Sequence, residues 1–176
     1  MNICIYASSK ENIDRKYIID AENIGKELAK QGHTLIYGAA STGLMGASAR
    51  GFYNGGGEII GIAPAFMEKF EPFYENCTQL IITKDMSERK IKLETIADIF
   101  VIFPGGIGTF DEFFQILTLR YLGQSDKEII LYNAHGYYDK LIEFLDSCFE
   151  KEFISDHVVH MFEVVNTKKE LLKLFE

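Results

Sequence analysis

The sequence has no tryptophan, only three cysteines and only three prolines among its 176 residues. The cysteines, Cys4, Cys77 and Cys148, form no Cys-x-x-Cys pair, so we expect neither a disulfide framework nor a cysteine metal site. A sparse, odd set of thiols is typical of reduced cysteines and indicates a cytoplasmic protein. No apolar run approaches the roughly 18 residues that a membrane-spanning helix requires, so no membrane association is expected. The N-terminal apolar run has no basic segment before it and predicts a first strand, not a signal peptide.

Positive charge is scarce as well. Lysine and arginine number 18 against 26 acidic residues, which gives a net charge of −8 at pH 7. This charge repels nucleic acids, so they are not expected partners, and the lack of a basic stripe further disfavours a DNA-binding role. His157 and His160 are three residues apart without a third ligand nearby, so we expect no metal ion and no cofactor. An anionic small molecule would need a local positive site.

Short apolar runs alternate with helix-length segments along the whole chain. The strand-like runs occupy residues 3–6, 34–37, 58–62, 80–83, 99–103 and 128–132. Between them, apolar residues recur at spacings of three and four, which predicts helices. Near-continuous apolar strands that alternate with helices indicate a parallel sheet covered on both faces. We therefore predict one domain over residues 1–176, an α/β fold with a Rossmann-like, doubly wound parallel sheet.

The turns that follow these strands carry the chemistry. In an open parallel sheet, ligands bind beyond the carboxyl ends of the strands. Four turns are expected to meet there, at residues 7–9, 38–46, 85–90 and 104–112. Residues 64–79 hold two of the three prolines and the least regular pattern, so we expect a short helix and a loop over the same rim.

The fourth turn, PGGIGTFDE at residues 104–112, is the most informative. It joins a predicted strand to an amphipathic stretch at 113–121 that predicts a helix. Gly105, Gly106 and Gly108 allow unusual backbone conformations and close approach of a ligand. Free amides and the positive end of a helix dipole at such a turn suit a phosphate. A tight turn that needs glycine for its own geometry explains the same residues equally well.

A Thr/Asp-x-x-Glu pattern occurs at 85–88, 109–112 and 167–170, and each copy predicts a capping box at the start of a helix. In such a box the glutamate side chain accepts a hydrogen bond from the amide of the first residue. At 109–112 a second interpretation is equally strong. There, Thr109 would contact a phosphate and Glu112 would act in catalysis.

Two cations in the third turn are out of place in a purely structural helix. If the helix starts after Asp85, Arg89 and Lys90 lie in or near its first turn, where each opposes the helix dipole by a few tenths to about 1 kcal/mol. An anionic partner would offset this cost, either Glu88 or a bound phosphate. We favour ligand contact over a surface ion pair for Arg89, whereas for Lys90 the two are balanced.

The turns at 7–9 and 38–46 are built from small residues. Ser8 is a candidate phosphate contact, and Gly43 would let the backbone approach either a phosphate or a neighbouring helix. The glycine spacing is not Gly-x-Gly-x-x-Gly, so an extended dinucleotide is not favoured. The two small-residue turns at 38–46 and 104–112, at one rim, suit a single mononucleotide held from both sides instead.

Three motifs together resemble the lonely-guy (LOG) family of cytokinin riboside 5′-monophosphate phosphoribohydrolases, formerly labelled lysine decarboxylases. They are PGGIGTFDE at 104–112, MSERK at 86–90 and GLMG at 43–46. The likeness extends to NAHGYYD at 133–139 and covers nearly the whole chain. Ala39 and Ala40 depart from it, because the family has glycines there. The resemblance implies a Rossmann-like fold and at least a homodimer, with the active site close to the subunit interface.

The resemblance also implies an activity. It makes Arg89 and Glu112 catalytic and assigns the 5′-phosphate to the PGGIGT backbone with Thr109. The other expected nucleotide contacts are Ser8, Gly43, Met86 and Lys90. The implied enzyme hydrolyses the N-glycosidic bond of a purine nucleoside 5′-monophosphate, with or without an N6 substituent, to free base and ribose 5-phosphate. The alternative is a noncatalytic carrier of a nucleotide or of molybdenum cofactor, which needs the glycine turns but not the Arg89–Glu112 pair.

Overall fold

The computed structural model describes residues 1–176 except for the side chains of residues 156 and 157, so His157 of the predicted histidine pair lies outside the described residues. The strands are β1 (Asn2–Tyr6), β2 (Thr34–Tyr37), β3 (Ile59–Pro64), β4 (Gln79–Thr83), β5 (Ile99–Ile102), β6 (Glu128–Tyr132) and β7 (Glu163–Val165). The α-helices are α1 (Arg15–Lys30), α2 (Gly43–Asn54), α3 (Met86–Ile96), α4 (Ile107–Tyr121), α5 (Asp139–Glu150), α6 (Asp156–Val159) and α7 (Lys168–Lys173). Two short 3-10 helices are η1 (Ala65–Lys69) and η2 (Ala134–Gly136).

The six predicted strands are confirmed, each within two residues of its expected limits. β7 is missed, because three residues are too short a run to show the period of a strand. α4 begins at Ile107 instead of residue 113, because the glycine-rich sequence itself forms the first helical turn.

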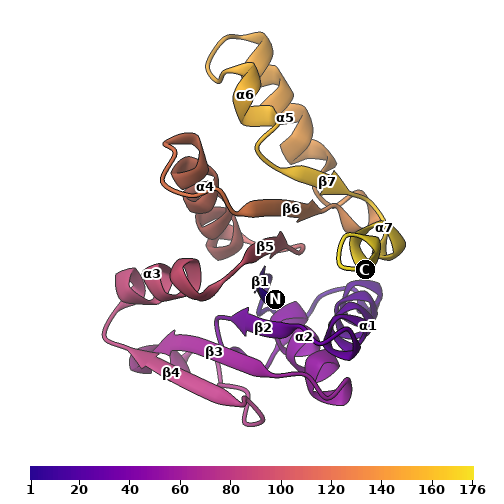
Figure 1. The fold of residues 1–176 in the computed structure, drawn as a ribbon, viewed down its shortest axis with the longest axis vertical. Coiled ribbons are helices and arrows are strands. Elements are labelled where there is room, and N and C mark those ends of the chain that lie inside the picture. The colour runs from indigo at the N-terminus through magenta and orange to yellow at the C-terminus, as the bar shows by residue number, and fades with distance from the viewer.

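The strands form one parallel sheet in the order β4-β3-β2-β1-β5-β6-β7, which confirms the doubly wound prediction. From β1 the chain builds outward to β4, and α3 then carries it back to the other side of β1, where β5 pairs. Figure 1 shows β1 and β5 next to one another at the centre of the fold. Connections leave these two strands in opposite directions, so their carboxyl ends form the switch point where a ligand crevice is expected.

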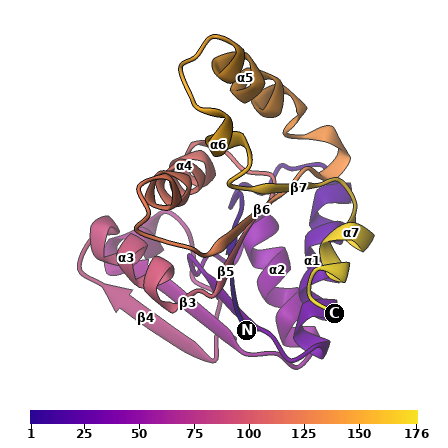
Figure 2. The ribbon, with the colours of Figure 1, turned by 45° about the horizontal axis from the view of Figure 1, so that its top comes forward.

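Helices cover both faces of the sheet. α1, α2 and α7 lie on one side, and α3 and α4 lie on the other, as Figure 2 shows. Ala21, Ile24 and Leu28 form the buried stripe of α1, and burial contributes about 1.5–3 kcal/mol for each large side chain. α1 and α2 approach closely, since a Cβ at Gly51 would lie 2.2 Å from the Glu22 carbonyl oxygen. This packing fixes α2 and the turn before it.

α5 extends away from these layers, at the top of the view in Figure 1. Within α5 the buried residue is Leu145, whereas Phe144 is exposed. Among the described residues, no helix has the length and apolar character needed to cross a bilayer.

Candidate active site

A cavity of about 370 Å³ opens at the carboxyl ends of β1 and β5. The lining residues are Ala7, Ser8, Ser9, Lys10, Met45, Met67, Glu71, Met86, Arg89, Gly106, Ile107, Gly108, Thr109 and Glu112. Each of the four predicted turns contributes to this set, as the parallel strand order requires. A cavity of similar volume, about 400 Å³, lies at the opposite edge beside Glu94 and Lys127, and none of the four turns lines it.

Two side chains of opposite charge meet in the wall of the first cavity. Arg89, in the first turn of α3, places its Nη1 2.7 Å from Oε1 of Glu112, in the second turn of α4. Both side chains are only 9% exposed, so the pair is shielded from water. Arg89 Nε also donates a 3.3 Å hydrogen bond to the carbonyl oxygen of Ile62 in β3. The structure therefore brings together the two residues that the sequence singles out for catalysis.

Gly38 makes room for the guanidinium. It follows β2, and a Cβ at this position would lie 2.3 Å from Arg89 Nη2. Real Cβ atoms do not approach a neighbour so closely, so any side chain here would displace the guanidinium. This role is not visible in the sequence, because the side chain that Gly38 accommodates comes from a distant helix.

Two opposing effects act on the protonation of Glu112. Burial raises the pKa of its carboxyl above the ordinary value of 4.5, because desolvation disfavours the charged form. The neighbouring Arg89 guanidinium lowers the pKa, but not enough to cancel the effect of burial. A carboxylate in this state accepts a proton more readily than a free glutamate does, which suits a general base.

Lys90 pairs with a different acid. Its Nζ lies 2.5 Å from Asp111 Oδ2, and the two side chains are 21% and 56% exposed. Lys90 is absent from the residues that line the cavity, whereas Arg89 borders it. Both cations at the start of α3 thus have acidic partners on α4, and neither pairs with Glu88.

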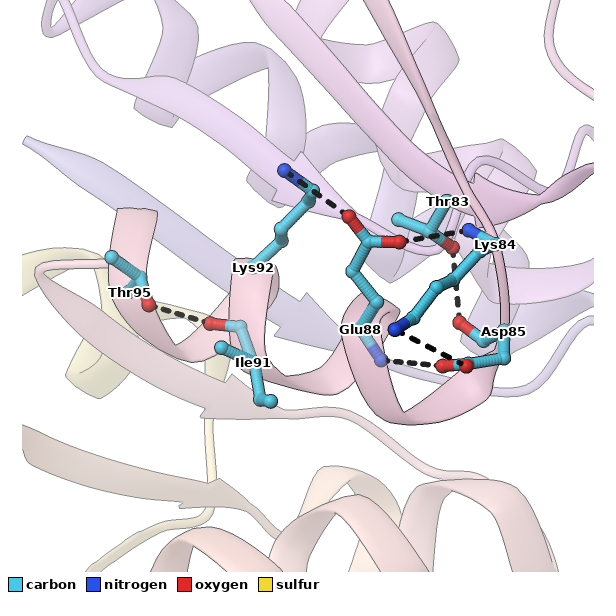
Figure 3. Close-up of polar contacts among 7 residues, drawn as sticks. All are labelled: Thr83, Lys84, Asp85, Glu88, Ile91, Lys92 and Thr95. Atoms are coloured by element: carbon cyan, nitrogen blue, oxygen red, sulfur yellow. Dashed lines mark hydrogen bonds and ion pairs between the residues drawn. The ribbon is translucent and has the colours of Figure 1, made fainter.

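Figure 3 shows what Glu88 does instead. Its Oε2 accepts a 2.9 Å hydrogen bond from the Lys84 amide, and its Oε1 lies 3.7 Å from Lys92 Nζ. The Asp85 side chain caps α3 by accepting a 2.8 Å hydrogen bond from the Glu88 amide. The predicted capping box is therefore half formed, because Glu88 reaches one residue further back than a box requires.

α4 starts without a side-chain cap, so the predicted capping box at Thr109 and Glu112 is wrong. The N-cap is Gly106, which places Thr109 inside the first turn and leaves Glu112 to pair with Arg89. The first amides of a helix have no acceptor within it. A Cβ at Gly106 or Gly108 would meet no heavy atom within 4 Å, so both leave open space at this helix start. The helix dipole favours an anion there.

The other predicted phosphate contacts differ in what they touch. A Cβ at Gly105 would lie 2.1 Å from Thr109 Oγ1, so the turn itself requires glycine there. Gly43 has a φ of +61°, and a Cβ there would lie 2.5 Å from the Ser8 carbonyl oxygen. Ser8 and Met86 line the cavity. The two glycines therefore shape the site, and the last two residues border it.

The strap between β3 and β4, within residues 64–79, borders the cavity as expected. It contains η1 and contributes Met67 and Glu71 to the lining. The Ser9 hydroxyl, from the turn after β1, donates a hydrogen bond to the Glu71 carboxylate. The sequence does not single out Met67 or Glu71, because they belong to an irregular segment with no motif.

Comparison with known proteins identifies close relatives in sequence. A family model described as possible lysine decarboxylase matches residues 45–175. A probable cytokinin riboside 5′-monophosphate phosphoribohydrolase of Oryza sativa subsp. japonica is 36% identical over 174 residues, which cover 99% of this chain and 70% of the relative. A cytokinin riboside 5′-monophosphate phosphoribohydrolase of Arabidopsis thaliana is 34% identical over 174 residues, which cover 99% and 82%.

Solved structures share the fold at lower identity. The molybdenum cofactor carrier protein of Chlamydomonas reinhardtii has a TM-score of 0.73 and 20% identity, over 99% of this chain and 96% of that chain. The molybdenum cofactor binding protein of Rippkaea orientalis has a TM-score of 0.72 and 18% identity, over 98% and 93%. At such identities the likeness shows a common Rossmann-like fold and nothing about ligands.

Proposed function

We propose that this chain, which belongs to the lonely-guy (LOG) family of cytokinin riboside 5′-monophosphate phosphoribohydrolases, hydrolyses the N-glycosidic bond of a purine nucleoside 5′-monophosphate. The products are the free base and ribose 5-phosphate. The observation that carries this proposal is the buried Arg89–Glu112 pair, 2.7 Å apart, beside the amide end of α4 in one cavity. A phosphate grip and an acid–base group thus border the same space. Its volume of about 370 Å³ falls in the roughly 300–1,000 Å³ range of ligand pockets.

Each part of the site has a proposed role. The 5′-phosphate binds to Gly106, Gly108 and Thr109 at the start of α4, and its binding energy fixes the ribose. Glu112 accepts a proton from the attacking water, whose oxygen bonds to C1′. The electrons of the C1′–N bond leave with the base, which takes up one proton from solvent, and Glu112 then releases to solvent the proton that it accepted. Before Glu112 accepts that proton, its negative charge also stabilises the oxocarbenium-like ribose, and Arg89 orients the carboxylate.

The residues that line the cavity support a more specific proposal about the substrate. The thioether side chains of Met45, Met67 and Met86 line the cavity and suit a purine base, with or without an N6 substituent. AMP and N6-substituted AMP are therefore the proposed substrates.

Ile107 at the cavity is 82% exposed, and Phe114 on the same helix is also exposed. Apolar surface beside the site supports a homodimer with the active site near its interface. The three free cysteines fit an enzyme of the cytosol.

A base-release assay tests the proposal. The protein is incubated with AMP, GMP, CMP and N6-isopentenyl AMP, and free base is quantified by chromatography. We expect release from a purine monophosphate with equimolar ribose 5-phosphate. Adenosine, which lacks the phosphate, is expected to react about 100-fold more slowly or worse. No release from any nucleotide, with a pterin or nucleotide bound to the purified protein, would favour a carrier instead.

A further inference from the structure

Two consecutive tyrosines after η2 hold the turn that precedes α4. The Tyr137 hydroxyl donates a 2.7 Å hydrogen bond to the carbonyl oxygen of Gly105. The Tyr138 hydroxyl donates a 2.6 Å hydrogen bond to the carbonyl oxygen of Phe103. Tyr138 is fully buried, whereas Tyr137 is 42% exposed. Neither tyrosine borders the cavity, so both act on the site through the backbone of this turn.

The bond from Tyr137 constrains the amide of a residue that lines the cavity, Gly106. A peptide group is planar and trans, so the Gly105 carbonyl and the Gly106 N–H point in opposite directions from one rigid plane. A hydroxyl that fixes the carbonyl therefore fixes the direction of the N–H. Within the described part of the chain, the Gly106 N–H has no acceptor. Gly106 lines the cavity, and the plane between two glycines would otherwise rotate freely.

The bond from Tyr138 has the same chemistry but cannot have the same effect. Its acceptor, the Phe103 carbonyl, belongs to the peptide group whose nitrogen is that of Pro104. Proline has no N–H, so this plane has no amide to direct. The Tyr138 hydroxyl also interacts with the Gly105 backbone, but Gly105 does not line the cavity. The two tyrosines thus form a matched pair on one turn, of which only Tyr137 binds the carbonyl of the peptide plane that carries the Gly106 N–H.

The segment that carries Tyr137 is itself held rigidly. Asn133 Oδ1 accepts a 2.7 Å hydrogen bond from the Tyr138 amide, and Asn133 Nδ2 donates a 2.8 Å hydrogen bond to Asp139 Oδ1. The Tyr137 ring packs edge-on against the rings of Tyr17 and Tyr138, at centroid distances of 6.1 Å and 4.9 Å. The Tyr137 side chain therefore reaches Gly105 from a rigid backbone segment, and little conformational entropy remains to be lost when a ligand binds.

We propose that Tyr137 is a positioning residue for the phosphate of the substrate, because its hydroxyl directs the Gly106 amide into the cavity through the Gly105 peptide plane. The ligand class is a ribose 5-phosphate monoester, an identity that rests on the proposed function. The expected consequence is selective: Tyr137 supports binding of the phosphate and has no effect on binding of the base.

Binding of ribose 5-phosphate to the whole protein, measured by calorimetry, tests this inference without requiring turnover. We expect Tyr137→Phe to raise the Kd about five- to tenfold, which is less than the loss of a whole hydrogen bond to a charged ligand, because the Gly106 amide remains and only its direction is released. Tyr138→Phe should leave the Kd within about twofold, although it lowers the Tm more, because it strands a buried carbonyl. Adenosine, which has no phosphate, should bind both variants as it binds the parent.

An unchanged Kd in Tyr137→Phe would overturn the inference. So would an equal loss in Tyr138→Phe, which would show that general stiffness of the turn matters, not the Gly106 amide. A parent protein that fails to bind ribose 5-phosphate would also overturn it. If the parent binds this product but releases no base from any nucleotide, the proposed hydrolysis fails on its own and the comparison of the two variants still decides the inference.

Discussion

The two ion pairs that join α3 to α4 are neighbours in the sequence and differ in almost every physical respect. Arg89 and Glu112 lie 2.7 Å apart, with both side chains 9% exposed, in the wall of the cavity. Lys90 and Asp111 lie 2.5 Å apart and reach solvent. Successive helical residues point about 100° apart, so one step along each helix separates a buried pair from a surface pair. The position of each residue around its helix, not its charge, decides which pair is buried beside the cavity and which faces solvent.

The energetics of the two pairs differ accordingly. Ionised groups lose hydration when they are buried, and a buried pair is often no more stabilising than apolar residues of the same size. A surface pair contributes about 0–1 kcal/mol and is screened by salt. Stability therefore does not explain why the buried pair is there. Its position beside the amide end of α4 supports a role in chemistry, and five substitutions test the contrast.

Glu112→Gln should have the largest effect on activity. The amide keeps the size of the carboxylate and one acceptor oxygen for Arg89 but cannot accept a proton from water. We expect kcat for base release to fall by about 10²–10⁴, the usual contribution of a general base. Binding of ribose 5-phosphate should change little. A variant that releases base at the parental rate would reduce Glu112 to a structural partner of Arg89.

Arg89→Met should have the largest effect on stability. It leaves the Glu112 carboxylate buried without its partner, and breaking a buried pair in this way costs about 3–5 kcal/mol. The pKa of Glu112 is already raised, and loss of the guanidinium raises it further. The folded variant then holds a proton that the unfolded chain has lost, so its stability should fall as pH rises from 4.5 through the raised folded pKa.

Urea unfolding of Arg89→Met at pH 5 and pH 8 checks this sign. The variant should lose more stability relative to the parent at the higher pH. The double variant Arg89→Met with Glu112→Gln removes the carboxylate and should recover most of the loss. Equal destabilisation at both pH values would show that Glu112 stays charged without Arg89.

Gly38→Ala disturbs the buried pair without changing either partner. The added methyl would lie 2.3 Å from Arg89 Nη2, so the guanidinium must move away from its present place beside Glu112. A displacement of about 1 Å in a catalytic group can cost about 10²-fold in rate, and we expect a loss of that order in kcat/KM. Introduced into Glu112→Gln, the same change should cost little more, which a double-mutant cycle measures.

Lys90→Ala and Asp111→Ala should have the smallest effects. Each breaks the solvent-facing pair, and each is expected to lower the free energy of unfolding by about 1 kcal/mol or less. Because neither side chain lines the cavity, kcat/KM for AMP should stay within about twofold of the parent. A large rise in KM for Lys90→Ala alone would instead support the nucleotide contact that the sequence suggests for this residue.

The three Thr/Asp-x-x-Glu patterns show how well a local sequence motif predicts a helix cap. At 167–170 the pattern forms a full box. At 85–88 it forms half of one, because the glutamate reaches the amide of Lys84. At 109–112 it forms none, because the helix starts at Ile107 and the glutamate pairs with Arg89. The pattern is the same three times, and tertiary neighbours decide how much of the local motif survives.

The fold and the place of the candidate site were accessible from the sequence, because both depend on patterns that repeat over a few residues. Apolar runs and helical spacings specify parallel strands that alternate with helices, and the strand order then brings four turns to one rim. The short β7 and the strap residues Met67 and Glu71 were not accessible, because neither has a periodic pattern or a motif.

Local patterns in the sequence specify a doubly wound sheet, a glycine-rich turn suited to phosphate before a helix, and two cations in an unfavourable position near the start of another helix at the same rim. Tertiary structure alone decided which acid each cation meets, why Gly38 must be bare and which glycines face the cavity. The physical reason is the distance along the chain over which each kind of interaction acts. Propensity and capping act within about one helical turn, whereas burial, ion pairing and steric room depend on side chains that only the folded sheet brings together.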